Sequence, residues 1–481
     1  MPADAALFLV DHARSPHAHA EAGSTLIQAA ARFMAGASRA LAFALLLGAA
    51  GPLAAQSTKF IPTFLIYYGG APTLTASDAA KLAKFDLLDI DRYRYRQIAP
   101  NTWAAIKALN PSVQIYLYEM GPEVYNNQDS LAQVSLNSLG RYNVSRGHPM
   151  GSLNGKAPGL FQLDSAGRRI YSVPYSNPGA GVYSYLMDFG SSAYQYYWVT
   201  AVKADIIDQP WRADGVFADG CVSLHSDGSY NAPSAWYSTN AAWSNAMNYF
   251  ARSIARGLHD YGQKLWCNKG GTRLSDGAAA WRALDASADR PDAMLEEGAF
   301  AVKWGWQTQF FAEDAWKRQV DTLASMQNIK AAMLSHTQLM PGQSGTDNWG
   351  KPVTFWQTLW YALGSFLLGK NDVQRNSYFM FTGGIGPNRI WWFDEYDKIN
   401  LGRARSTYAV RSVGGVNVYS REFDLGYVYV NPTAKDVPSL TLPSAGRQLT
   451  HDNLFWALSG IPRVTTIALK GHTAAIVLKA P

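Results

Sequence analysis

The sequence predicts an α/β fold, namely a (β/α)₈ TIM barrel followed by a small C-terminal antiparallel β-sandwich domain. After residue 64, eight short apolar runs alternate with segments of helical periodicity. Runs that are apolar throughout are typical of parallel strands covered on both faces. From residue 403 the pattern changes to period-two alternation without helices, which predicts a separate β domain. A doubly wound open sheet is the alternative for the first part.

The length and composition indicate a large folded protein. The 481 residues exceed one ordinary domain, and 48% hydrophobic against 16% charged residues excludes a disordered chain. The net charge of +6 is mild and no Lys/Arg-rich run occurs, so nucleic acid is not expected as a partner. We expect a monomer whose partner is a carbohydrate.

Residues 1–55 resemble a leader with a secretory signal peptide. The apolar run 40–50 follows Arg39 and is too short to span a bilayer. Small residues before Gln56 predict cleavage near Ala55, and Met34 is a candidate initiator. The prediction is therefore a secreted or periplasmic protein without stable membrane insertion. An uncleaved amphipathic helix is the alternative.

The predicted barrel occupies residues 56–402 and the β domain residues 403–481. The expected barrel strands are 64–68, 86–91, 113–120, 215–220, 265–268, 293–298, 331–336 and 378–382. Helices are expected at Trp103 to Leu109, along an apolar stripe from Trp243 to Leu258, and over 354–368, with a long insertion at 121–213. In the β domain, 416–423 and 427–430 should form one hairpin, and 467–470 and 475–478 a second around Gly471.

Acidic residues fall at the carboxyl ends of the predicted strands, where TIM barrels carry their active sites. Asp219 ends the fourth strand, and Glu296 and Glu297 end the sixth. Hydrolysis of a glycosidic bond needs two carboxyl groups, so these three residues are the catalytic candidates. Only one of the two glutamates can face the mouth, because strand side chains alternate, and we favour Glu297 beside Gly298. A structural carboxylate that caps a helix is the alternative for Asp219.

Further strand-end residues are candidates for substrate binding. Aromatic rings can stack on sugars, and polar groups can bond their hydroxyls. The candidates are Asp89, Asp91, Tyr67, Tyr68, Glu119, Asn268, His336, Trp304 and Trp306. The alternatives are ion pairs of the two aspartates with neighbouring arginines, a wall position for His336, and loop packing for the aromatic residues.

Metal and cofactor chemistry are not predicted. His-x-x-x-His pairs, EF-hand spacing and Cys-x-x-Cys are all missing from the sequence. Gly383–Gly386 lacks a phosphate-loop lysine and is interpreted as a turn. Cys221 and Cys267 end neighbouring strands and are either a disulfide bridge or two buried thiols.

Three segments resemble bacterial glycoside hydrolases of the hypothetical glycosyl hydrolase family 15 type and, more distantly, the endo-α-1,4-polygalactosaminidases. They are 85–91 (FDLLDID), 186–190 (LMDFG) and 213–220 (ADGVFADG), and the closing elements 419–423 and 430–432 are similar as well. The resemblance implies a TIM barrel that acts on an α-linked or amino-sugar-containing polysaccharide. It further implies that Asp219 is the nucleophile or base and that a glutamate of the sixth strand is the acid.

The sequence therefore predicts an exported glycoside hydrolase that uses two carboxylates. A non-catalytic carbohydrate-binding barrel and a polysaccharide lyase are the rival hypotheses. Release of reducing ends would separate hydrolysis from binding alone, and ultraviolet absorbance of a new double bond would indicate a lyase.

Overall fold

The computed structural model describes residues 59–68, 74–91, 100–126, 158–209, 213–223, 229–303 and 307–479. The chain divides into two compact units, residues 1–55 and 56–481, and all the described residues belong to the second. The predicted leader and its cleavage site lie outside the described residues.

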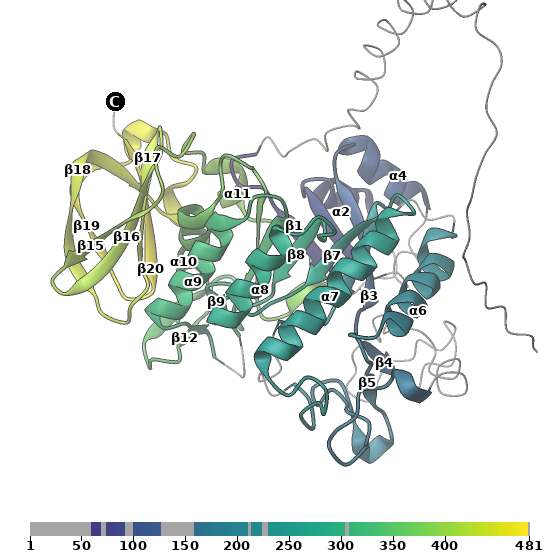
Figure 1. The fold of residues 1–481 in the computed structure, drawn as a ribbon. Coiled ribbons are helices and arrows are strands. Elements are labelled where there is room, and N and C mark those ends of the chain that lie inside the picture. The colour runs from purple at the N-terminus through teal and green to yellow at the C-terminus, as the bar shows by residue number, and fades with distance from the viewer. Residues whose placement is uncertain are drawn as a thin grey trace, which may run out of the picture. The chain divides into compact units, whose positions relative to one another are not determined.

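Eight parallel strands form the barrel, and they follow one another around it in sequence order (Figure 1). They are β1 (Phe64–Tyr67), β2 (Leu87–Asp91), β3 (Gln114–Met120), β6 (Gly215–Asp219), β7 (Lys264–Asn268), β8 (Ala293–Glu296), β11 (Lys330–His336) and β14 (Ser377–Thr382). A bridge between Thr63 and Phe379 brings the last strand back to the first. The predicted barrel and its eight strands are confirmed, and the doubly wound alternative is excluded because its strand order reverses at a switch point.

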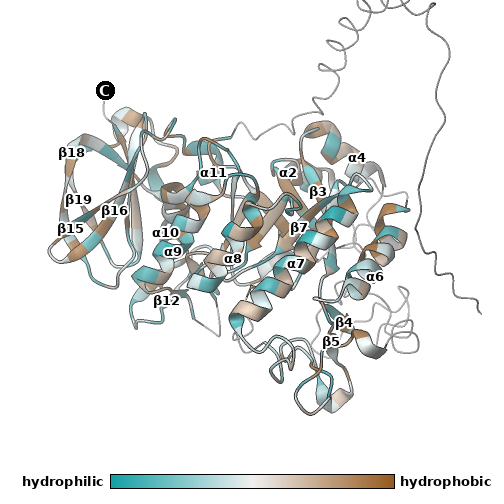
Figure 2. Cartoon of the chain, in the orientation of Figure 1, coloured by the Kyte–Doolittle hydropathy of each residue, from teal (hydrophilic) through white to brown (hydrophobic). Residues whose placement is uncertain are grey.

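Helices cover the outside of the barrel. They are α2 (Ala76–Leu82), α4 (Pro100–Leu109), α6 (Ser192–Val202), α7 (Asn240–His259), α8 (Ser275–Asp285), α9 (Glu313–Ser325), α10 (Phe355–Gly369) and α11 (Asp394–Lys398). The stripe from Trp243 to Leu258 is fully buried, and hydrophilic colours mark the face of α7 turned to the viewer in Figure 2. Thr354 caps α10, which is buried on nearly all sides as predicted. Leu109 is an exception, because it is exposed at the end of α4 and not on its buried face.

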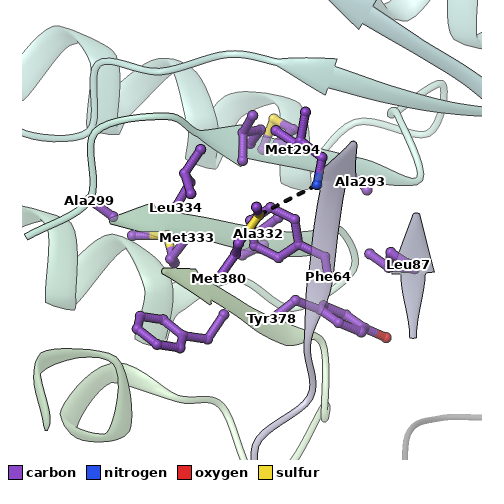
Figure 3. Close-up of a cluster of buried hydrophobic side chains, with 14 of the residues drawn as sticks. Phe64, Leu87, Ala293, Met294, Ala299, Ala332, Met333, Leu334, Tyr378 and Met380 are labelled. Atoms are coloured by element: carbon purple, nitrogen blue, oxygen red, sulfur yellow. Dashed lines mark hydrogen bonds between the residues drawn. The ribbon is translucent and has the colours of Figure 1, made fainter. Parts of the chain in front are cut away.

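Large side chains fill the barrel interior. The rings of Phe64, Tyr116 and Phe217 each pack edge-on against Trp266 at 5.1 to 5.4 Å. Figure 3 shows the neighbouring part of the core, where the Met380 sulfur accepts a hydrogen bond from the Ile66 backbone amide at 3.4 Å. The barrel is therefore a packed core and not a pore, and a substrate has access only at a mouth.

Loop insertions carry short elements of their own. After β3, the strands β4 (Glu123–Tyr125) and β5 (Ser184–Leu186) pair antiparallel, with short helices η1 (Pro158–Leu160), η2 (Pro178–Ala180) and the π-helix η3 (Lys203–Ile207). Later loops carry β9 (Ala301–Val302) with β10 (Gln309–Phe310), β12 (Ser344–Thr346) with β13 (Pro352–Thr354), and η4 (Gly386–Asn388). In the 186–190 motif, Asp188 accepts hydrogen bonds from Tyr237 and Gln162 and so anchors the insertion.

The C-terminal domain is one six-stranded antiparallel sheet in the order β15-β16-β17-β20-β18-β19, where a sandwich would have two sheets. Its elements are β15 (Ala409–Val413), β16 (Val416–Glu422), β17 (Gly426–Asn431), β18 (Val437–Leu449), β19 (Arg463–Leu469), β20 (Thr473–Lys479), η5 (His451–Asn453) and η6 (Leu458–Gly460). The hairpin β16–β17 is confirmed. The second predicted hairpin is wrong, because the long strand β18 lies between β19 and β20 and pairs with both.

Helix α10 joins the sheet to the barrel. A Cβ atom at Gly364 would lie 2.4 Å from the Cβ of Ala474, so the helix and β20 pack at backbone distance. The buried Arg421 of β16 donates to the carbonyl oxygens of Leu367, Leu368 and Lys370 at the end of α10. Within the described ranges, no helix is long and apolar enough to cross a membrane.

Candidate active site

Asp219 is the last residue of β6, and three donors point at its carboxylate. The backbone amide of Gly220 and the side-chain amide of Asn268 each donate to Oδ1 at 2.8 Å. The hydroxyl of Tyr118, on β3, donates to Oδ2. Donors converging in this way stabilise a negative charge and fix the orientation of the carboxylate.

Glu297 follows β8 and meets Asp219 through a shared partner. The Asn268 side-chain nitrogen donates to Glu297 Oε2 at 2.7 Å while it also donates to Asp219. Glu296 turns to a different place, because its Oε2 accepts from the backbone amide and the hydroxyl of Thr272, both at 2.6 Å. Of the two glutamates, the structure thus places Glu297 beside Asp219 and uses Glu296 to hold the loop before α8.

The separation of the two carboxylates can be bounded from these bonds. One oxygen of Asp219 lies 2.8 Å, and one oxygen of Glu297 2.7 Å, from the same nitrogen, so the two oxygens are at most 5.5 Å apart. Carboxyl groups of retaining glycosidases are about 5 to 5.5 Å apart, and those of inverting enzymes about 6.5 to 9.5 Å. The bound applies to one oxygen of each carboxyl group, and it is compatible with the retaining spacing.

The surroundings of Glu297 favour its protonated form. Desolvation by the walls of the mouth, followed by the nearby charge of Asp219, raises the pKa of Glu297 to about 7. The amide of Asn268 and the charge of Lys303 act in the opposite direction. Solvent still reaches the Glu297 side chain, so it is accessible to a substrate. A carboxyl group with these properties can donate a proton at neutral pH.

Asp89 lies in the same mouth at the end of β2. Its carboxyl is buried, Oδ2 accepts a long bond of 3.4 Å from the Tyr68 hydroxyl, and Oδ1 has no hydrogen-bond partner among the described residues. Burial, then the charges of Asp219 and Asp91, raise its pKa well above the usual range. The Tyr68 ring packs edge-on against the ring of Tyr118 at 5.2 Å, so both tyrosines line the wall beside Asp219. Asp91 is also buried, on the same strand face as Asp89.

Other predicted site residues lie away from the two carboxylates. Glu119 is buried near Tyr194 of α6, because alternation along β3 turns Tyr118 inward and Glu119 outward. Tyr67 lines a cleft on the α2 side of the barrel together with Lys81 and Trp392. Trp304 and Trp306 lie outside the described residues.

His336 contacts backbone and not the open mouth. Its Nδ1 accepts from the amide of Lys303 at 2.9 Å, and its Nε2 lies 3.3 Å from the carbonyl oxygen of Glu297. Burial, followed by the charge of Lys303, lowers the pKa of His336 to about 4, so the ring is neutral. With Nδ1 as acceptor, Nε2 carries the proton and donates to Glu297.

Two thiols and a lysine lie behind the site. Cys221 and Cys267 are buried and free, so the structure has thiols in place of a disulfide. Lys269 is also buried, its Nζ has no hydrogen-bond partner in the described part of the chain, and burial lowers its pKa to about 8. Among the described residues, no group of three or more His, Cys, Asp or Glu side chains is arranged to hold a metal ion.

Sequence reasoning missed Tyr118 and the link made by Asn268. Tyr118 lies two residues after the inward-facing Tyr116, so the period-two pattern of β3 carries a signal for its direction. Asn268 was predicted as a substrate contact, and its bonds to both carboxylates appear only once the neighbouring strands are in register.

Comparison with curated proteins found no match, whereas solved structures of low sequence identity are similar to this chain. The chain is similar over 88% of its length to all of the trehalulose synthase from Pseudomonas mesoacidophila MX-45, with 10% identity and a TM-score of 0.47. It is also similar to the isomaltulose synthase from Protaminobacter rubrum, with 9% identity and a TM-score of 0.47. This match covers 88% of the present chain and 99% of the synthase. For the GH36 α-galactosidase from Geobacillus stearothermophilus the sequence identity is 10% and the TM-score is 0.39. The chain spans only 55% of that protein's length.

One family model matches the greater part of the chain. The match covers residues 107–427, which includes β3, β6 and β8 with Asp219 and Glu297. The chain belongs to hypothetical glycosyl hydrolase family 15.

Proposed function

We propose that this protein is an exported glycoside hydrolase that cleaves a polysaccharide or oligosaccharide with retention of anomeric configuration. The observation that carries the proposal is the Asn268 amide, which holds Asp219 and Glu297 with their nearest oxygens at most 5.5 Å apart. Membership of a glycosyl hydrolase family supports the reaction class. The resemblance to polygalactosaminidases makes α-linked and amino-sugar polymers the first substrates to screen.

In the proposed mechanism, Asp219 is the nucleophile and Glu297 the general acid and base. Asp219 attacks the anomeric carbon while Glu297 gives its proton to the leaving oxygen, and a glycosyl ester forms on Asp219. The Glu297 carboxylate then takes a proton from water, whose oxygen displaces Asp219 and restores both groups. The pKa of about 7 at Glu297 suits both halves of this cycle near neutral pH.

The experiment compares Asp219→Asn and Glu297→Gln with the unchanged protein. Both variants keep side-chain size, so we expect melting temperatures close to that of the parent and loss of reducing-end release. The control is Glu296→Gln, whose carboxyl bonds Thr272 and not Asn268, and which should keep its activity. Full activity in either test variant would refute the assignment. Binding of oligosaccharide by all four proteins without cleavage would favour a carbohydrate-binding barrel.

The stereochemical result can be read independently. Proton NMR of the first products distinguishes retention from inversion of the anomeric centre. An inverted product would show that a water molecule fits between the two carboxyl groups, contrary to the spacing argument.

Export is proposed from the leader alone, with its apolar run at 40–50 and small residues before Gln56. Mass spectrometry of the protein recovered from the periplasm or medium should give Gln56 as its first residue. Recovery of an exported protein that still carries leader residues before Gln56 would contradict the proposed cleavage.

A further inference from the structure

The backbone that follows Glu297 is fixed at almost every position. The Gly298 carbonyl oxygen accepts from Gln319 Nε2, and the Phe300 amide donates to Gln319 Oε1, both at 2.8 Å. Between them, the Ala299 amide donates to the Leu334 carbonyl oxygen at 2.9 Å. The Gln319 side chain on α9 therefore forms hydrogen bonds with this backbone in the way that a neighbouring β-strand would.

Two residues of β11 complete this arrangement. The Ser335 hydroxyl donates to the Ala299 carbonyl oxygen. His336 binds the Glu297 carbonyl oxygen at 3.3 Å and the Lys303 amide at 2.9 Å, and so joins both ends of the segment 297–303. Successive backbone groups after Glu297 thus have partners on α9 and β11.

The conformation of this segment requires such support. Phe300 is buried and has a φ of 62°, a left-handed backbone that residues other than glycine rarely adopt. Strained conformations of this kind persist where the surroundings determine them, and they occur often at functional sites. The buried Gln319 amide contacts the backbone on both sides of Ala299, directly at the sharp change of direction.

We propose that Gln319 is a positioning residue for Glu297, acting through the backbone of Gly298 and Phe300. Its two bonds turn the chain immediately after β8, and this turn directs the Glu297 carboxyl toward Asn268 and Asp219. The catalytic meaning of this role rests on the proposed function, whereas the placement of the carboxyl does not.

The position of the Glu297 carboxyl affects its pKa, which can be measured. Asp219 from β6, Glu296 from β8 and Lys303 from the following segment act on the charge of Glu297, as do the titratable groups of Asp89 on β2 and Tyr68 after β1. His336 from β11 is neutral. When the segment loosens, the Glu297 carboxyl moves away from Asp219 and gains water. Both changes favour ionisation. Loss of the Asn268 amide acts in the opposite direction, but desolvation and the Asp219 charge are the larger influences on Glu297, so its titration should move to lower pH.

The experiment measures the titration of Glu297 by ¹³C NMR of protein labelled at the glutamate carboxyl carbons. The resonance is assigned by its loss in Glu297→Gln. In the parent we expect a midpoint near pH 7, and in Gln319→Met, which keeps the length but has no amide, a midpoint lower by about one pH unit or more. Ser335→Ala removes a single bond to the same backbone, and its midpoint should move in the same direction by less.

The control is Thr322→Val, a buried near-isosteric change on the same helix, whose hydroxyl has no hydrogen-bond partner within the described ranges. It should leave the midpoint unchanged, whatever its melting temperature. An unchanged midpoint in Gln319→Met would overturn the proposal and reduce Gln319 to a stability role. If Gln319→Met does not fold, Gln319→Leu takes its place, and an unchanged midpoint in that variant would overturn the proposal. Full activity of Glu297→Gln would remove the catalytic role of Glu297 and leave this result intact.

Discussion

Replacing Asn268 with leucine removes the one amide that both carboxylates share and keeps a side chain of similar volume. Hydrogen bonds to charged groups contribute about 1.5–3 kcal/mol, and one pKa unit corresponds to about 1.4 kcal/mol. Because solvent reaches Glu297, we take the lower end and expect its pKa to rise by about one unit. The direction is upward, since the Asn268 amide stabilises the ionised carboxylate and its loss favours the proton.

The assay is the pH dependence of kcat/KM. Glu297 must be protonated to act as the acid, so activity falls as pH rises through its pKa, near 7 in the parent. In Asn268→Leu this falling limb should move to about pH 8, while the maximal rate drops about 10-fold or more because Asp219 loses a donor. A limb that stays in place or moves to lower pH would refute the shared-amide geometry, whatever happens to the rate.

Two further variants test the buried charges around the site. Lys269→Met removes a buried amine whose pKa is about 8 and which has no hydrogen-bond partner among the described residues. The free energy of unfolding at pH 7 should therefore rise by about 3 kcal/mol, and this gain should vanish above pH 10.5; a loss of stability at pH 7 would contradict it. Asp89→Asn removes a carboxyl whose pKa is well above the usual range, and that group costs the parent stability as pH rises above about 4. The variant's gain in melting temperature should therefore grow from pH 4 to pH 8, and equal gains at both would show that Asp89 is not held protonated.

The barrel could be predicted because each strand carries its own signal. All eight apolar runs became barrel strands, since strands covered on both faces have no polar face to break the run. The second hairpin of the β domain failed for a different reason. The two predicted strands, 467–470 and 475–478, are close in sequence, but β18 lies between them in the sheet. Strand β18 was not predicted because it contains Pro438 and Pro443, which are unusual inside strands, and its register shifts twice.

The strand-end rule found the two carboxylates but could not orient their neighbours. We predicted Asp219 and Glu297 from their positions at the ends of the fourth and sixth strands. Glu119 was predicted for the mouth by the same rule, and it points toward α6 because it is one residue out of phase with Tyr118. Gln319 gave no signal, since a buried glutamine inside an amphipathic helix reveals its role only through the loop it contacts.

The barrel itself explains why an amide lies between the two acids. Asp219 and Glu297 come from β6 and the end of β8, which have β7 between them, and adjacent strands are about 4.8 Å apart. The two backbones are therefore about 10 Å apart, and the side chains must reach inward to bring their oxygens within 5.5 Å. A residue from β7 necessarily lies in that gap. A carboxylate there would add repulsion, and an apolar residue would remove the one donor that bonds both acids, leaving Asp219 with the Gly220 amide and the Tyr118 hydroxyl. Asn268 is neutral and donates to both, so one residue on the intervening strand sets the spacing that the proposed double displacement requires.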